Sequence, residues 1–154
     1  MQKSRITKHI FILGLLSAVM LLLSACSSSQ KSTSSDKVSI VASTNVYADI
    51  AKNVAGKYGN VQAVIKNSAT DPHDFEPTTA DAKELSKANI IVANGLGYDD
   101  WMNKLASSVN KKPVLVGEDL MHLKKGDNPH IWYNLDMPTK YVNYLVKRLS
   151  KLQP

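Results

Sequence analysis

From residue 38 onward, short apolar segments alternate with helical segments, and this alternation constrains the fold more than any other feature. Four of the apolar segments are short and rich in β-branched residues, which is typical of buried strands. They are Val38–Ser43, Val61–Ile65, Asn89–Asn94 and Pro113–Val116. Strands that alternate with helices favour a parallel sheet with helices on both faces. We therefore predict an α/β fold built on a parallel four-stranded sheet with flanking helices.

Helical periodicity occupies the intervals between and after these strands. The expected helices cover residues 45–55, 78–88, 98–109 and 138–152. Asn45 is expected to cap the first helix and Gly56 to end it. Acidic residues 99–100 suit the positive end of the third helix, with Trp101 in the core behind them. Pro138 is expected at the first position of the last helix.

The first 25 residues have the composition of an export signal. Three basic residues precede the apolar run Ile10–Leu23, which is shorter than the roughly 20 residues that a membrane span needs. Small residues then lead to Cys26, the only cysteine, in a pattern similar to a bacterial lipobox. We predict a lipoprotein signal peptide at residues 1–25 with lipidation at Cys26; a signal peptide with an incidental cysteine is the alternative. Residues 26–37 are polar and are expected to form a flexible tether.

The overall charge gives little support for a nucleic-acid partner. The formal charge of +6 falls to +3 when residues 1–25, which hold three basic and no acidic side chains, are removed. The lysines are scattered and form no basic helix or aromatic platform. If Cys26 carries lipid, no thiol remains for a disulfide, so the folded part must be stable without cross-links.

Two short motifs, Asp71–Pro77 and Asn128–Tyr133, each place a histidine directly after a proline. Neutral imidazole is the commonest metal ligand among side chains, and a preceding proline restricts the backbone that carries it. The motifs follow the second and fourth predicted strands. Loops after parallel strands emerge at the same edge of a sheet, where ligands bind. The sequence therefore predicts a metal site built from two loops, in which Asp71 fixes the first turn.

The order of these segments resembles one family of transport proteins. The strand at Val38, DPHDFEPTTAD (Asp71–Asp81), NIIVANGLGYDDWM (Asn89–Met102) and NPHIWYN (Asn128–Asn134) occur as in the metal-binding lipoproteins of ATP-driven zinc and manganese importers. The resemblance implies a two-lobed, periplasmic-binding-protein-like fold with metal held between the lobes. Residues 38–137 would form the N-terminal lobe. Residues 138–154 would begin the helix that links the lobes, with the C-terminal lobe absent.

The resemblance also implies the ligands. His73 and His130 would bind Zn²⁺, or alternatively Mn²⁺, and the C-terminal lobe would supply the remaining ligands. Asp74 and Glu76 are weaker candidates that would orient His73 rather than bind the ion. His122, which lies beside lysines, is expected to be a surface residue. The aromatic residues 132–133 are expected to pack the loop.

The function implied is an extracytoplasmic solute-binding lipoprotein that passes the ion to an ABC-transporter permease. It would be anchored through Cys26 to the outer face of the cell membrane, in keeping with a Gram-positive cell. Three alternatives stay open: a surface adhesin, a metal-buffering lipoprotein and a non-functional fragment. A separately encoded C-terminal lobe is a further possible partner. An enzyme is not expected, because no H-E-x-x-H or comparable catalytic metal motif is present.

Overall fold

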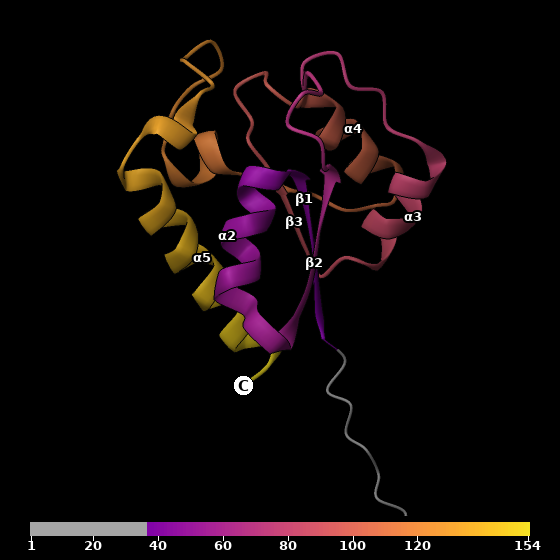
Figure 1. The fold of residues 1–154 in the computed structure, drawn as a ribbon, viewed down its shortest axis with the longest axis vertical. Coiled ribbons are helices and arrows are strands. Elements are labelled where there is room, and N and C mark those ends of the chain that lie inside the picture. Colours follow the sequence, from indigo (N-terminus) through magenta and orange to yellow (C-terminus); the bar gives the residue numbers. More distant parts are fainter. Residues whose placement is uncertain (1–36) are drawn as a thin grey trace, which may run out of the picture. The chain divides into compact units, whose positions relative to one another are not determined.

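The computed structural model describes residues 37–154 (Figure 1). The predicted signal peptide, Cys26 and nearly all of the predicted tether lie outside the described residues. The elements are β1 (Val38–Thr44), α2 (Asn45–Ala55), the 3₁₀ turn η2 (Gly56–Tyr58), β2 (Gly59–Ile65), α3 (Thr79–Lys87), β3 (Ile90–Ala93), α4 (Asp100–Ser108), β4 (Val114–Leu115), the π-helical turn η3 (Val116–Leu120), the 3₁₀ turn η4 (Ile131–Tyr133) and α5 (Asp136–Leu152).

The four strands form one parallel sheet in the order β2-β1-β3-β4, which confirms the predicted fold class. In this sheet Ile40 of β1 lies opposite Val61 of β2 on one side and Ile90 of β3 on the other. The chain therefore leaves β1 in one direction to form β2 and returns past it to form β3. The carboxyl ends of β1 and β3 flank the point where the strand order reverses, and ligands bind at such points in α/β sheets.

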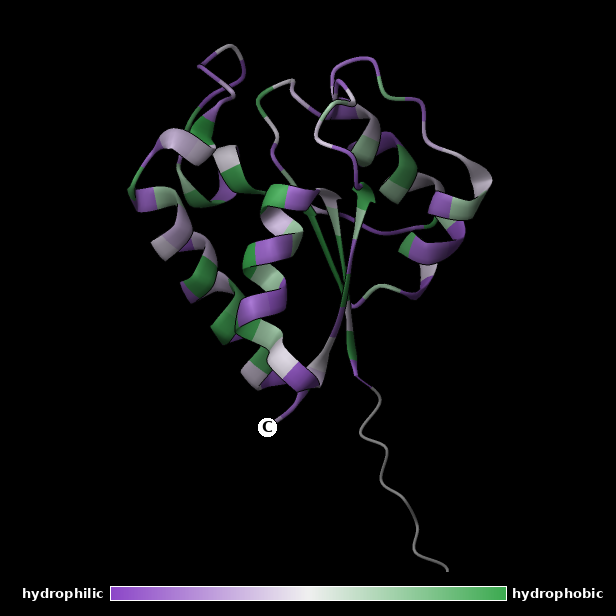
Figure 2. Cartoon of the chain, viewed as in Figure 1, coloured by the Kyte–Doolittle hydropathy of each residue, from purple (hydrophilic) through white to green (hydrophobic). Residues whose placement is uncertain are grey.

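Helices cover both faces of the sheet. Helices α2 and α5 pack side by side on one face, and α3 and α4 cover the other (Figure 1). Alternate residues of β1 divide between the two cores: Ile40 and Ala42 belong to the α2–α5 side and Val41 to the α3–α4 side. Strand β3 is buried and apolar throughout and β1 is mostly so, because helices cover both faces of the sheet, whereas the edge strand β2 also contains Asn60 and Gln62. Figure 2 shows the hydrophobic residues gathered in the strands between the helices. Among residues 37–154, no helix combines the length and apolar character required to cross a bilayer.

The predicted ends of some elements are wrong by one or two residues. Thr44, not Asn45, occupies the N-cap position of α2, and its side chain makes no capping hydrogen bond. Gly56 ends that helix at a positive φ of 52°, as predicted. Helix α5 begins at Asp136, so Pro138 is its third residue rather than its first. The helix tolerates this because N–H groups of the first turn have no partner within the helix.

Candidate metal site

The two histidines lie in turns of the same kind. In each, the side-chain oxygen of the residue two positions before the histidine accepts a hydrogen bond from the histidine backbone N–H. Asp71 Oδ1 lies 2.9 Å from His73 N, and Asn128 Oδ1 lies 3.0 Å from His130 N. Such Asx turns, with proline at the central position, fix the local backbone. The prediction that Asp71 fixes the first turn is confirmed.

Asn128 also orients the imidazole of His130. Its Oδ1 atom lies 2.7 Å from Nδ1 of the ring. The same atom accepts the backbone N–H of His130, so it is the amide oxygen and a hydrogen-bond acceptor. Nδ1 must therefore carry the hydrogen, which leaves the lone pair of Nε2 free for a metal ion. Asn128 was not among the predicted site residues, although it stands where Asp71 stands in the other motif.

Both turns line one open hollow of about 630 Å³ at the carboxyl edge of the sheet. Its walls come from the end of β1 and start of α2, the loop after β2, Tyr98, and the loop that carries His130. The lining residues are Thr44, Asn45, Val46, Ile65, Asn67, Ser68, Ala69, Thr70, Asp71, Pro72, His73, Tyr98, His130, Trp132 and Tyr133. The lining includes one carboxylate and no lysine or arginine, so no fixed positive side chain opposes a cation there. The prediction that the two loops share one edge is confirmed.

Tyr98 lies between the two histidines. Its ring centre is 4.9 Å from that of His73 and 6.1 Å from that of His130, both edge-on. Partial burial, followed by the negative charges of Asp71 and Asp99, raises the pKa of Tyr98. Tyr98 thus places a neutral, aromatic wall beside both imidazoles. The sequence pattern indicated Tyr98 only as the start of a helix.

The two aromatic residues after His130 differ. Trp132 packs against Tyr98 at 5.1 Å and against His130 at 5.2 Å between ring centres, as predicted for a residue that packs the loop. Tyr133 contacts the ring of Trp132 at 6.0 Å between ring centres but is 81% exposed, so the prediction that it packs the loop is confirmed only in part. Its position in the 3₁₀ turn η4 directs it away from the core that Ile131 enters.

Asp74 and Glu76, the weaker candidates, are both exposed, and within the described residues neither makes a hydrogen bond to His73. Thr78 and Asp81 cap α3: the side chain of each accepts a hydrogen bond from the backbone N–H of the other. His122 is exposed and has a positive φ of 60°, in agreement with the predicted surface position.

The two acidic residues at the start of α4, Asp99 and Asp100, have different roles. Asp100 begins the helix as predicted, whereas Asp99 is buried and its carboxylate faces the end of β3. Its two oxygens accept the N–H groups of Asn94, at 2.7 Å, and Gly95, at 2.9 Å. Burial raises the pKa of Asp99, and the nearby Ser43 hydroxyl and these N–H groups oppose the rise. Asp99 therefore organises the turn after β3 rather than capping α4.

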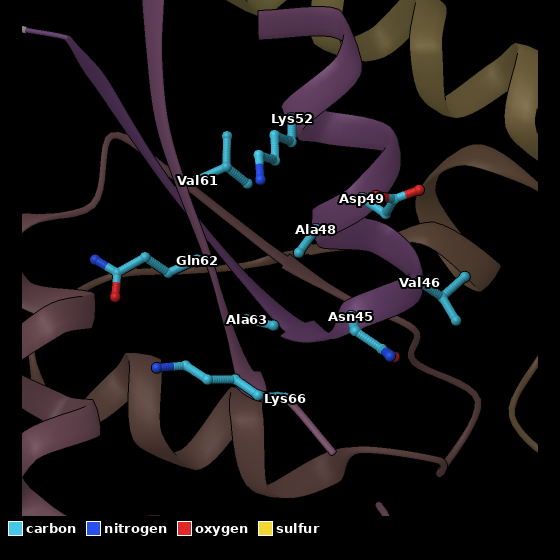
Figure 3. Close-up of a pocket in the computed structure, with 9 residues that line it drawn as sticks. All are labelled: Asn45, Val46, Ala48, Asp49, Lys52, Val61, Gln62, Ala63 and Lys66. Carbon is cyan, nitrogen blue, oxygen red and sulfur yellow. The ribbon is translucent and has the colours of Figure 1, made fainter. Parts of the chain in front are cut away.

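Within residues 37–154, no three side chains of histidine, cysteine, aspartate or glutamate gather in an arrangement that could hold a metal ion. The described residues therefore offer two imidazoles at one hollow. A second hollow of about 640 Å³ between α2 and β2 contains no imidazole and is flanked by Lys52 and Lys66 (Figure 3). The chemistry suited to a transition-metal cation is thus concentrated at the histidine hollow.

The fold and the hollow define an α/β ligand-binding lobe, with its candidate ligands at the carboxyl edge of a parallel sheet. Residues 40–154 match the family model described as "Zinc-uptake complex component A periplasmic". The chain belongs to this family of metal-transporter substrate-binding proteins, as its motifs predicted. The family consists of transport components rather than enzymes.

Among its relatives is the manganese ABC transporter substrate-binding lipoprotein ScaA of Streptococcus gordonii. The two are 37% identical over 149 residues, which cover 86% of this chain and 48% of the relative. Among solved structures, the Zn(II)-bound ZnuA-like domain of Streptococcus pneumoniae AdcA is similar with a TM-score of 0.63 and 27% identity, over 77% of this chain and 45% of that chain. A Mn-bound periplasmic metal-binding protein from Candidatus Liberibacter asiaticus is similar with a TM-score of 0.63 and 25% identity, over 77% of this chain and 47% of that chain. This chain spans about half the length of the relatives it matches.

Proposed function

We propose that this chain carries the metal-binding N-terminal lobe of an extracytoplasmic solute-binding lipoprotein that captures Zn²⁺, or alternatively Mn²⁺, for an ABC transporter. His73 and His130 are the proposed ligands. The observation that carries the proposal is the pair of Asx-Pro-His turns that bring both histidines to one hollow, on either side of Tyr98. Asp74 and Glu76 are proposed to orient His73 from outside the set of ligands rather than to bind the ion.

Zinc is the better fit to these two side chains. Zn²⁺ prefers four ligands in a tetrahedron, with imidazole nitrogens at ~2.0–2.1 Å, and two histidines supply half of that set. Mn²⁺ lies lower in the affinity order and favours oxygen ligands. Relatives named for manganese and for zinc are both known, so the oxygen or nitrogen donors that complete the site would decide between the two ions. We place those donors in a second lobe, in keeping with the half-length match to relatives.

The remaining parts of the proposal concern the membrane. Residues 1–25 would be removed as a signal peptide, and Cys26 would carry the lipid that holds the protein at the outer face of the membrane of a Gram-positive cell. Residues 26–37 would be the tether and residues 138–154 the start of the interlobe helix. The permease of an ABC transporter is the proposed partner, supported by relatives that are named as transporter lipoproteins.

A competition titration tests the metal site. The full chain, purified in detergent, is titrated with Zn²⁺ and Mn²⁺ against a chromophoric chelator, alongside His73→Ala and His130→Ala. We expect one zinc ion per chain, weaker manganese binding, and a loss of zinc affinity in each variant that exceeds the roughly 10–100-fold typical of removing an outer partner.

His122→Asn is the matched control, because it removes an exposed imidazole outside the hollow and asparagine tolerates a positive φ. Its zinc affinity should equal that of the unmodified chain. Binding that is indifferent to both His73 and His130, or that is lost in the His122 variant, would contradict the proposed site.

A further inference from the structure

A proline precedes each proposed ligand, and the peptide unit between the proline and the histidine is hydrogen-bonded at both ends. The N–H end is held locally by Asp71 or Asn128, as described above. The carbonyl end is held from elsewhere in the chain, and at Pro129 it also accepts a local bond from the backbone N–H of Ile131 at 2.8 Å. Pro72 O accepts a hydrogen bond from Trp101 Nε1 at 2.9 Å, and Pro129 O accepts one from Asn94 Nδ2 at 3.1 Å.

Both remote donors belong to one short segment, residues 94–101, which runs from the end of β3 into α4. A peptide unit is planar, so fixing its C=O and its N–H fixes the orientation of the whole unit. The Cα of the histidine is attached to that unit, and the direction in which its side chain leaves the backbone is then largely determined. One segment thus acts on two histidines that are far apart in the sequence.

The segment is rigid enough for this role. Asn94 is fully buried, and its Oδ1 accepts the hydroxyl of Tyr47 while its backbone N–H is held by Asp99. Leu96, in the left-handed region at a φ of 58°, donates its N–H to Glu118 at 2.9 Å. The contacts with Tyr47 and Glu118 attach the segment to α2 and η3, and the contact with Asp99 joins the two halves of the segment to each other.

The other end of the segment is equally well held. Trp101 is 8% exposed, and its ring packs against Phe75 at 4.7 Å between ring centres. Phe75 lies two residues after His73, so Trp101 contacts the histidine loop through both a hydrogen bond and a ring. Tyr98, midway along the segment, meets both imidazoles edge-on.

We propose that residues 94–101 are a common positioning element for the two metal-binding histidines, with Trp101 acting on His73 and Asn94 acting on His130. This inference rests on the proposed function in one respect only, that the imidazoles bind an ion. The positioning itself is a property of the metal-free chain. It predicts that loss of one remote hydrogen bond disturbs one histidine selectively.

The test uses Trp101→Phe, which keeps an aromatic ring and removes the N–H donor. Long-range ¹H–¹⁵N spectra of the imidazoles are recorded on the metal-free full chain in detergent, with signals assigned from the His73→Ala and His130→Ala variants. We expect the His73 signals to move and the His122 signals to stay. The zinc affinity should fall by about tenfold, the lower part of the range for outer partners.

Tyr141→Phe is the matched control for a general loss of stability. It also removes a buried side-chain donor to a backbone carbonyl, that of Tyr47, but on the α2–α5 side of the sheet. The His73 signals should not move in this variant. Asn94→Asp keeps the acceptor for Tyr47 and removes the donor that Pro129 O and Gly95 O share, so it should move the His130 signals.

The outcomes separate this inference from the proposed function. If the imidazole signals respond as expected while zinc binding ignores both histidines, the positioning element stands and the metal function fails. If Trp101→Phe leaves the His73 signals unchanged and the zinc affinity within twofold, the positioning inference is overturned. The same holds if Tyr141→Phe disturbs His73 as strongly as Trp101→Phe does.

Discussion

The two histidine turns share one backbone design and differ in how far they control the ring. Asp71 and Asn128 each accept the backbone N–H of the histidine two residues later. Asn128 additionally binds Nδ1 of His130. Asp71 makes no bond to the ring of His73, whose imidazole is instead packed edge-on against Tyr98 at 4.9 Å.

This difference separates two functions that one turn can have. An Asx turn shapes the backbone in both loops, but only at His130 does it also select the tautomer that leaves Nε2 free. In the proposed site, the His130 imidazole is therefore oriented before an ion binds, and the His73 imidazole keeps more freedom. A pre-oriented ligand loses less conformational entropy when an ion binds. A substitution that displaces the whole shared segment should affect both turns, whereas a substitution within one turn should affect that turn alone.

The largest effect is expected at Gly95, in the shared segment. Its φ is +79°, and a Cβ there would lie 1.9 Å from Glu118 Oε2, the carboxylate that also holds Leu96 N. Gly95→Ala therefore combines left-handed strain with displacement of Glu118. We expect the free energy of unfolding to fall by about 2–3 kcal/mol, measured by denaturant unfolding of the metal-free chain.

Gly97→Ala provides the matched control. Gly97 also has a positive φ, +85°, but a Cβ there would meet no atom within 4 Å. Only the strain of about 1–2 kcal/mol should remain. Zinc affinity should also fall in the Gly95 variant, because the shared segment positions both His73 and His130. Equal destabilisation by the two substitutions would show that Glu118 does not anchor the segment.

The next largest effect is expected at Asn128, in one turn only. Asn128→Ala removes both the Asx turn and the acceptor for Nδ1 of His130. We expect zinc affinity, measured by chelator competition, to fall roughly 10–100-fold because outer partners of metal-bound histidines contribute that much.

The control for this substitution is Asn134→Ala. Asn134 Oδ1 accepts the backbone N–H of Asp136 at 2.9 Å, a turn of the same kind that contains no histidine. Its zinc affinity should match that of the unmodified chain. A comparable loss in both variants would mean that loop rigidity, rather than the tautomer of His130, sets the affinity.

The sequence was sufficient for the sheet, the helices and the shared edge of the two histidine loops. These follow from local patterns: runs of apolar residues, helical periodicity, and the rule that parallel strands end at one edge. The turn at Asp71 was also predictable, because an Asx residue before proline is a local signal. The identical signal at Asn128 was present in the sequence, and comparing the two motifs residue by residue would have found it.

The roles of Asn94, Asp99 and Trp101 were not predictable in this way. Trp101 was expected in the core, and it is buried, but its hydrogen bond reaches Pro72, 29 residues away. Asn94 likewise bonds Pro129 across 35 residues. Asp99 next to a helix start has an obvious local explanation, and its bonds to Gly95 and Asn94, four and five residues earlier in the chain, were not predicted. Side-chain contacts between distant loops depend on packing that periodicity does not encode.

The smallest effects are expected when the asparagine at 128 becomes aspartate or the aspartate at 71 becomes asparagine. The two substitutions should change the zinc affinity in opposite directions, which tests the difference between the two turns most directly. Asn128→Asp keeps an oxygen for both N–H groups of His130 and makes it an ionised, stronger acceptor. A carboxylate partner raises the basicity of a metal-bound imidazole, so zinc affinity should rise a few-fold, roughly. Asp71→Asn keeps the backbone turn and removes the only carboxylate that lines the hollow, so zinc affinity should fall by a similarly small factor.

The Asp71 variant has a second readout that needs no metal. Burial is the main cause that raises the pKa of Tyr98, and the charge of Asp71 adds to it. Asp71→Asn removes that second contribution, so the pKa of Tyr98 should fall toward its ordinary value while remaining raised by burial. An ultraviolet titration that compares the Asp71→Asn and Asn128→Asp variants measures this. If Tyr98 responds to neither substitution while zinc affinity responds to both, the two Asx residues act on the ion through their histidines alone, and Tyr98 is only a wall between them.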